Sequence, residues 1–371
     1  MSSTSATPAP LPLTIRSLSS ADEVPAWSTF VGTRGFAHRA GDPGRFLSRF
    51  NADATASHSR VIVATLPDAA APRLVGGVRL VERTISLDSC GERRAHVVGW
   101  ADVCSAPELR GRGIVGALLA EARARTAALA VEWEARDGAP VVALLHAAES
   151  VRGLYEKFGF VRGRLDVAYA KVQLSAGPDA YASAGSSASA STVARPLEGG
   201  SEGLTVSSVN FSAAWRELDA LRASTLSRCN IIGATTRDEA YWTRWIPITA
   251  ATALVLRHAD GLPLAYGAVV ARDGLLRVVD WAQSAELDAV NARAFLCECA
   301  RVCGTLADDA FVAMPLALAK DALGGEQVLD GSVSDLGWMI LADGAKGADA
   351  AALLAAAAAE GRFCVYVADS F

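Results

Sequence analysis

Residues 103–119 read VCSAPELRGRGIVGALL, and this stretch decides how the first half of the chain folds. An apolar strand ends near Ser105, and Pro107 blocks further strand pairing because proline has no backbone N–H to donate. The turn 110–113 (RGRG) then leads into apolar residues spaced about 3.6 apart, which predicts a helix over 111–133. The first turn of a helix offers unpaired N–H groups and the positive end of its dipole, and glycines let an anion approach. The stretch therefore predicts a pyrophosphate cradle, and the alternative is a plain strand–turn–helix junction with surface arginines.

The segments around this junction predict an α/β domain in the first half of the chain. Residues 140–145 (PVVALL) form a continuous apolar run, as expected of a strand that is covered on both faces. Alternating apolar residues predict further strands, and a spacing of 3.6 residues predicts further helices. The predicted strands are 13–16, 60–65, 74–82, 95–105, 140–145 and 165–174, and the predicted helices are 21–33, 111–133 and 150–158.

A second short motif, LYEKFGF, occupies residues 154–160, after the apolar strand. The glycine turn and this motif, in this order and on these elements, resemble the GNAT superfamily of N-acetyltransferases. The pyrophosphate-loop pattern of that family, Arg/Gln-x-x-Gly-x-Gly/Ala, is matched at Arg110 and Gly113 and departs at Val115, which still offers its backbone N–H. The family's second pattern is Tyr-x-x-x-Gly-Phe, and it is matched at Tyr155, Gly159 and Phe160.

The resemblance covers residues 13–175 and implies a mixed, mostly antiparallel sheet flanked by helices, with acetyl-CoA as the co-substrate. It implies that the strand before the loop lies along the pantetheine arm and that the backbone N–H groups of the loop hold the pyrophosphate. The cofactor-binding residues implied in this way are Val103, Cys104, Ser105, Arg110, Gly111, Arg112, Gly113, Ile114, Val115 and Gly116.

The resemblance also implies direct attack of an acceptor amine on the acetyl thioester. Tyr155 is then the expected general acid, because its phenol can give a proton to the departing CoA thiolate. The base that takes the proton of the amine stays open between His146, Asp102 and, less favoured, Glu149, and a water chain without a single base is a further alternative. A covalent intermediate on Cys104 is not expected, since direct transfer is the habit of the family.

The composition excludes several function classes. A net charge of −5 and a pI of 5.6 give no general attraction to nucleic acid or to an anionic membrane. The seven cysteines include no CxxC pair, which predicts a reduced, cytoplasmic setting and no bound metal. No apolar run reaches the roughly 18 residues that cross a bilayer, and the N-terminus lacks the pattern of a secretory signal.

The second half repeats the order of the first, which predicts an internal duplication of the fold. Residues 1–12 are expected to be a disordered tail, 13–175 the GNAT domain and 204–371 a degenerate GNAT-like domain, joined by a Ser/Ala/Gly/Pro linker over 176–203. The junction equivalent to the glycine turn reads QSAELDAVNARAF over 283–295. It has no glycine, and its acidic side chains would repel pyrophosphate, so this half is not expected to bind CoA.

Tandem arrangements of this kind resemble fungal lysine N-acetyltransferases and the enhanced-intracellular-survival aminoglycoside acetyltransferases. The latter group uses a C-terminal carboxylate in the active site, and this chain ends in Phe371, so that the same role is a candidate here. The aromatic segment 241–245 (YWTRW) either lines the acceptor pocket or buries its tryptophans in a core, and the second reading is favoured. The predicted function is acetyl transfer to a primary amine of a small molecule. Acetylation of a protein or peptide and a non-catalytic CoA sensor are the alternatives.

Overall fold

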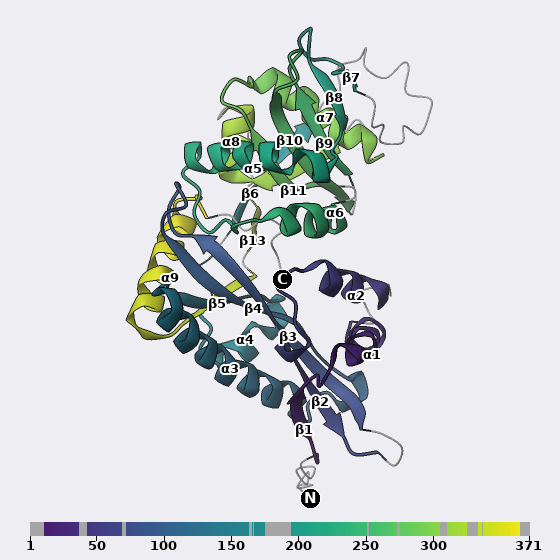
Figure 1. The fold of residues 1–371 in the computed structure, drawn as a ribbon, viewed down its shortest axis with the longest axis vertical. Coiled ribbons are helices and arrows are strands. Elements are labelled where there is room, and N and C mark those ends of the chain that lie inside the picture. Colours follow the sequence, from purple (N-terminus) through teal and green to yellow (C-terminus); the bar gives the residue numbers. More distant parts are fainter. Residues whose placement is uncertain are drawn as a thin grey trace, which may run out of the picture.

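Two mixed sheets, each covered by helices, form the two lobes of the computed structural model (Figure 1). The structure describes residues 11–36, 43–68, 72–162, 165, 167–174, 194–250, 252–272, 275–304, 310–324, 333–335 and 337–363. Most of the predicted tail, most of the predicted linker and Phe371 lie outside these ranges. Within them, no helix is long and apolar enough to cross a membrane, and no three or more His, Cys, Asp and Glu side chains are grouped to hold a metal ion.

The first sheet has the order β1-β2-β3-β4-β5-β14, and every neighbouring pair is antiparallel except β4 and β5. The mixed, mostly antiparallel sheet that the sequence predicts is therefore confirmed. Its strands are β1 (Thr14–Ser17), β2 (Val61–Leu66), β3 (Arg73–Ser86), β4 (Arg94–Ser105), β5 (Val141–His146) and β14 (Trp338–Ala342).

Helices cover both faces of this sheet, and two adjacent glycines of β3 show which helix lies on which face. A Cβ at Gly76 would touch Ile114 and Leu118 of α3 (Ile114–Asp137), whereas a Cβ at Gly77 would touch Trp27 of α1 (Val24–Phe30). Successive strand residues point to opposite faces, so α1 and α3 sandwich the sheet. α4 (Arg152–Glu156) follows β5, and α2 (Pro43–Ala52), which the sequence analysis did not predict, packs beside α1.

The second sheet repeats the first, with the order β13-β6-β12-β11-β10-β9-β8-β7. As in the first lobe, antiparallel strands lead to one parallel pair, β11 with β12, and the long helix α7 connects the two. The strands are β6 (Val167–Leu174), β7 (Arg195–Pro196), β8 (Thr205–Ser208), β9 (Thr252–Arg257), β10 (Pro263–Arg272), β11 (Leu275–Gln283), β12 (Ala310–Pro315) and β13 (Val333–Asp335). The helices are α5 (Phe211–Arg228), α6 (Ile246–Thr249), α7 (Ala289–Val302) and α8 (Leu316–Leu323).

The two lobes exchange a strand, which the division at 175 and 204 does not anticipate. β6 comes from the first half of the chain but pairs with β12 and β13 in the second sheet. β14 comes from the second half but pairs with β5 in the first sheet, and α9 (Gly344–Ala359) packs on both strands (Figure 1). β14 and α9 therefore belong to the first lobe, although they come from the second half of the chain.

The exchange creates a third hydrophobic core that neither half of the chain could form alone. Val142 and Leu144 of β5 point into it and meet Ile340 of β14 and Leu354 of α9. The alternate residues of β5 point to the core under α3, so both faces of this strand are covered, as its unbroken apolar run predicts. This core therefore ties the second half of the chain to the first lobe.

Candidate active site

The turn between β4 and α3 leaves the start of the helix uncapped and open. Gly111 and Gly113 have φ of 76° and 83°, a left-handed conformation that glycine adopts without steric cost. Gly113 is the N-cap of α3 and has no side chain to accept from the first N–H groups of the helix. A Cβ at Gly111, Gly113 or Gly116 would meet no atom of the described chain within 4 Å. Unpaired donors, the helix dipole and open space together fit a bulky anion such as a pyrophosphate.

Tyr155 and Cys104 lie next to each other behind this turn, both with little exposure to solvent. The phenol of Tyr155 is in α4, and burial together with the neighbouring Cys104 thiol raises its pKa to about 12. Burial and the charge of Asp102 raise the pKa of the Cys104 thiol well above its usual range. At neutral pH the phenol therefore keeps the proton that a general acid needs, and the thiol is not a nucleophilic thiolate.

A β-bulge in β4 places the predicted base Asp102 and the predicted cofactor strand. Gly77 pairs with Cys104 but Arg79 pairs with Ala101, so that Asp102 and Val103 together face one residue of β3. Asp102 has a φ of 55°, in the left-handed region that aspartate tolerates better than most residues. Within the described residues, β4 pairs with β5 only over His96–Gly99, and the two strands separate beyond Gly99. Residues 103–105 thus have a free strand edge, which fits backbone contacts with an extended ligand.

Charged side chains that the sequence analysis did not select surround Asp102. The Asp102 carboxylate accepts from Arg79 Nε at 2.9 Å, and Arg79 Nη1 lies 3.5 Å from Asp53 Oδ2. Burial raises the pKa of Asp53, but Arg83 and Arg79 outweigh it and hold that pKa below its usual value. Burial and the nearby Arg45 lower the pKa of Arg49 in α2 to about 10. The signal in the sequence was two arginines, at positions 79 and 83, in a strand whose residues 74–78 and 80–81 are apolar or glycine, since a buried charge needs a partner.

The other predicted proton acceptors lie elsewhere. His146 ends β5, where its ring meets Trp338 of β14 edge to face, with centroids 5.3 Å apart. Its imidazole is exposed and lies against Gly337. Glu149 begins an exposed 3-10 turn before α4. The structure thus brings Asp102, Cys104 and Tyr155 together, whereas it sets His146 beside the exchanged strand.

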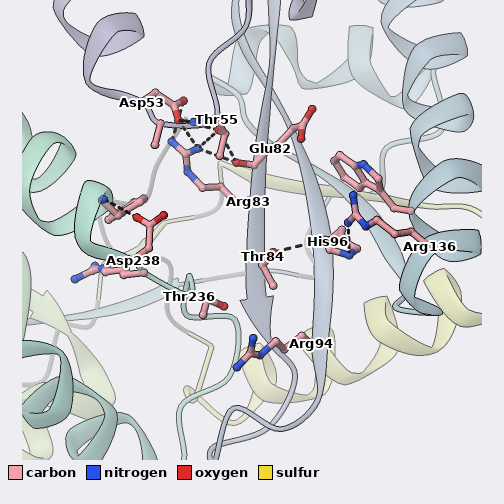
Figure 2. A pocket seen from close by; sticks show the side chains of 14 residues that line it. Asp53, Thr55, Glu82, Arg83, Thr84, Arg94, His96, Arg136, Thr236 and Asp238 are labelled. Carbon is pink, nitrogen blue, oxygen red and sulfur yellow. Dashed lines mark hydrogen bonds and ion pairs between the residues drawn. The ribbon is translucent and has the colours of Figure 1, made fainter. Parts of the chain in front are cut away.

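A polar cavity of about 350 Å³ lies between the lobes, along the edge of β3 (Figure 2). Trp133 and Arg136 close one side near the end of α3, and 19 helical residues separate Trp133 from Ile114, or about 29 Å at 1.5 Å per residue. The cavity is therefore distinct from the glycine turn. The side chains that line it come from both lobes and are Asp53, Ala54, Thr55, Glu82, Arg83, Thr84, Arg94, His96, Trp133, Arg136, Thr236, Arg237, Asp238 and Tyr241.

The aromatic segment 241–245 divides between this cavity and a core. Trp242 and Trp245 are fully buried in the second lobe, while Tyr241 also lines the cavity. At the junction equivalent to the glycine turn, Asp288 is the N-cap of α7 and its carboxylate accepts from the Asn291 N–H at 2.8 Å. That helix start is filled by an anionic side chain of the chain itself, so it does not fit a pyrophosphate.

Comparison with known proteins identifies the first lobe. Residues 57–162, which contain the bulge, the glycine turn and Tyr155, match the family model of the acetyltransferase (GNAT) domain. No curated protein matches the chain in sequence. The chain thus contains a GNAT acetyltransferase domain, as the two motifs predict.

Solved structures share the fold over both lobes. A GCN5-related N-acetyltransferase from Kribbella flavida is 17% identical, with a TM-score of 0.56 over 88% of this chain and 70% of that one. A probable N-acyltransferase from Enterococcus faecalis V583 is 12% identical, with a TM-score of 0.54 over 88% and 72%. The N-myristoyltransferase of Saccharomyces cerevisiae, solved with bound myristoyl-CoA, is 13% identical, with a TM-score of 0.53 over 92% and 86%. The likeness at these identities is one of fold.

Proposed function

We propose that this chain, whose residues 57–162 form a GNAT acetyltransferase domain, transfers the acetyl group of acetyl-CoA to a primary amine of a small molecule. The observation that carries the proposal is the uncapped, open start of α3 beside a buried, protonated Tyr155. An anion site and a proton donor next to one strand edge are the parts that acetyl transfer from CoA requires.

The residues of the turn and of β4 would hold the co-substrate. The N–H groups from Gly111 to Gly116 would bind the pyrophosphate, with Arg110 and Arg112 adding positive charge at the rim. The free edge of Val103–Ser105 would bind the pantetheine arm through backbone groups. Acetyl-CoA supplies the activated acetyl thioester, and every other group in the reaction belongs to the acceptor or to this chain.

Tyr155 would donate the proton that the leaving thiolate takes up. The proton of the attacking amine would go to Asp102 or to His146. Asp102 lies in the bulge next to Cys104 and Tyr155, and its carboxylate is oriented by Arg79. His146 is exposed at the end of β5 and would reach the amine only from the side of β14. The positions support Asp102 more strongly, and substitution of each residue separates the two.

The cavity between the lobes is a candidate place for a small polar acceptor. Its volume is in the range of small-molecule sites, and its wall carries carboxylates together with guanidinium groups, those of Asp53, Glu82, Asp238, Arg83, Arg94, Arg136 and Arg237. Asp53 shares Arg79 with Asp102, which connects one end of the cavity to the bulge. A site of this volume favours a small amine over a folded protein as the acceptor.

An acceptor screen tests the proposal. The full chain is mixed with acetyl-CoA and a panel of amino acids, polyamines, aminosugars and peptides, and free thiol is measured. We expect turnover on a small amine that falls at least tenfold in Tyr155→Phe. The matched control is Tyr266→Phe, a buried tyrosine of the second lobe, which should keep its activity. Failure of the chain to bind acetyl-CoA in calorimetry would contradict the proposal.

A further inference from the structure

A buried chain of alternating charges runs from the β4 bulge to the boundary with the second lobe. Its members are Asp102, Arg79, Asp53 and Arg83, and consecutive members are joined by ion pairs of 2.9, 3.5 and 2.9 Å. The side chains of Arg79, Arg83 and Asp53 are only 3–4% exposed. Two positive and two negative groups give no net charge, which is how a set of buried ions avoids an uncompensated member.

The geometry of Asp53 makes it the centre of this chain. Its two oxygens accept from Arg83 Nη1 and Nη2 at 2.9 and 3.1 Å, and Thr55 donates its hydroxyl to Oδ1 at 2.8 Å (Figure 2). Asp53 follows directly after α2. Its other ion-pair partner, Arg79, lies on β3 of the first sheet. Residues 79 and 83 are four apart on one strand, so they point to the same face and both reach Asp53.

The second lobe closes the far end of the chain with two aromatic rings. The guanidinium of Arg83 lies over Tyr241 at 5.5 Å and over Trp245 at 5.2 Å from the ring centroids. Both distances are within the range of a cation–π contact, and the desolvated setting strengthens it. In the same π-helical turn, Arg244 donates to the carbonyl of Asn51 in α2. The second lobe therefore fixes both the guanidinium and the helix end that carries Asp53.

The near end of the chain is the bulge that the candidate active site depends on. The left-handed φ of Asp102 is a conformation that surrounding contacts must hold in a residue other than glycine. Arg79 Nε donates to the Asp102 carboxylate at 2.9 Å. A shift of Arg79 would therefore move the backbone of residues 102–105.

We infer that the second lobe positions the acetyl-transfer site through this chain of charges. The positioning residues for the β4 bulge are Arg79, Asp53, Arg83, Tyr241 and Trp245. The inference rests on the proposed function in that the bulge is taken as the place of acetyl transfer. It gives the second lobe, in which Asp288 fills the start of α7, a role in the reaction.

Trp245→Leu tests the inference in the full chain, with Trp281→Leu as the matched control. Both tryptophans are fully buried in the core of the second lobe, but Trp245 lies against the guanidinium of Arg83, whereas Trp281 packs against Phe295. We expect Trp245→Leu to lower kcat at least tenfold and to leave the KM for acetyl-CoA within twofold. Trp281→Leu should leave kcat within twofold. An equal loss of kcat in both variants would overturn the inference.

Two further comparisons separate positioning from general destabilisation. In an Arg79→Met background the chain of charges is already interrupted. Trp245→Leu should then change kcat less than twofold, because the effects of substitutions at coupled residues are not additive. An undiminished tenfold loss in that background would contradict a route through Arg79. If the tryptophan variants do not fold, Arg83→Lys should retain at least threefold more kcat than Arg83→Met, since lysine keeps the positive charge beside Asp53. Equal values would count against the inference.

Hydrogen exchange gives a readout that does not depend on finding the acceptor. Amides of residues 100–105 should exchange at least fivefold faster in Trp245→Leu than in the unmodified chain, and at the unmodified rate in Trp281→Leu. Unchanged exchange in both variants would overturn the inference whether or not the chain turns over an amine. Faster exchange with no turnover on any acceptor would support the positioning and count against the proposed function.

Discussion

Tyr155 shows how burial prepares one residue for one role. A free tyrosine has a pKa near 10, and burial in the cleft raises the pKa of this phenol to about 12. The fold thus stabilises the neutral phenol over the phenolate. The protonated phenol contributes fully to the free energy of unfolding below pH 10, and this stabilisation is lost as the pH rises through 12.

This shift predicts the pH dependence of the reaction. As long as Tyr155 is protonated it can act as an acid, so kcat should show no loss from its ionisation below about pH 11. Tyr155→Phe should lower kcat at least tenfold at every pH from 7 to 10, and the shape of the pH–rate profile should stay the same. A pH–rate profile of kcat with both proteins measures this. A basic limb near pH 10 that disappears in the variant would show that the phenol ionises at its ordinary pKa.

At the scale of elements, the two lobes contain the same strand–turn–helix junction with opposite chemistry. In the first lobe, Gly113 begins α3 with bare N–H groups and open space. In the second, Asp288 begins α7 and fills those donors with its own carboxylate. One residue type at the N-cap therefore decides whether an otherwise repeated element is an anion site or a closed helix end.

This contrast predicts opposite effects of two substitutions. Gly116→Ala should stabilise α3 by about 0.5 kcal/mol, because alanine favours a helix and meets no protein atom there. It should nevertheless weaken acetyl-CoA binding severalfold, since the added methyl group takes space that the pyrophosphate would use. Asp288→Ala should cost about 1 kcal/mol through the lost cap and leave acetyl-CoA binding unchanged. Thermal unfolding and calorimetric titration measure both. Tighter or equal binding in Gly116→Ala would place the cofactor elsewhere.

At the scale of the whole molecule, the strand exchange makes the lobes depend on each other. β5 is an inner strand only because β14 pairs with it, and without β14 its apolar edge would be open. β6 has its partners, β12 and β13, in the second lobe. The third core and the chain of charges cross the same boundary, so packing, pairing and the site all join the two halves.

This dependence predicts the behaviour of fragments. Residues 1–174 expressed alone should show no cooperative thermal transition, because they lack the partners of both β5 and β6. Co-expression of 1–174 with 194–371 as separate chains should restore one cooperative transition and acetyl-CoA binding within twofold of the full chain. Circular dichroism and calorimetry provide the measurements. A fragment 1–174 that melts cooperatively and binds acetyl-CoA would show that the exchange is dispensable.

The sequence by itself determined the features that depend on neighbours along the chain. Arg110–Gly113 and the helix after it specify an open, uncapped helix start, because cap chemistry and glycine conformation are local. The unbroken apolar run of β5 predicted a strand with two covered faces. The motif around Tyr155 predicted that this residue is the candidate general acid. The repeated order of elements predicted a second lobe of the same fold, and its acidic junction predicted the closed start of α7.

Only the tertiary structure decided what depends on distant parts of the chain. The sequence does not indicate which sheet takes the strand at 338–342, because its partner β5 lies almost 200 residues earlier in the chain. It leaves Asp102 and His146 as equal candidates, whereas their neighbours, Arg79 and Trp338, come from elements far away in sequence. For the same reason, the sequence does not identify the ion-pair partners of Arg79 and Arg83. A buried charge requires a counter-ion, but strand pairing and packing in three dimensions select which residue supplies it.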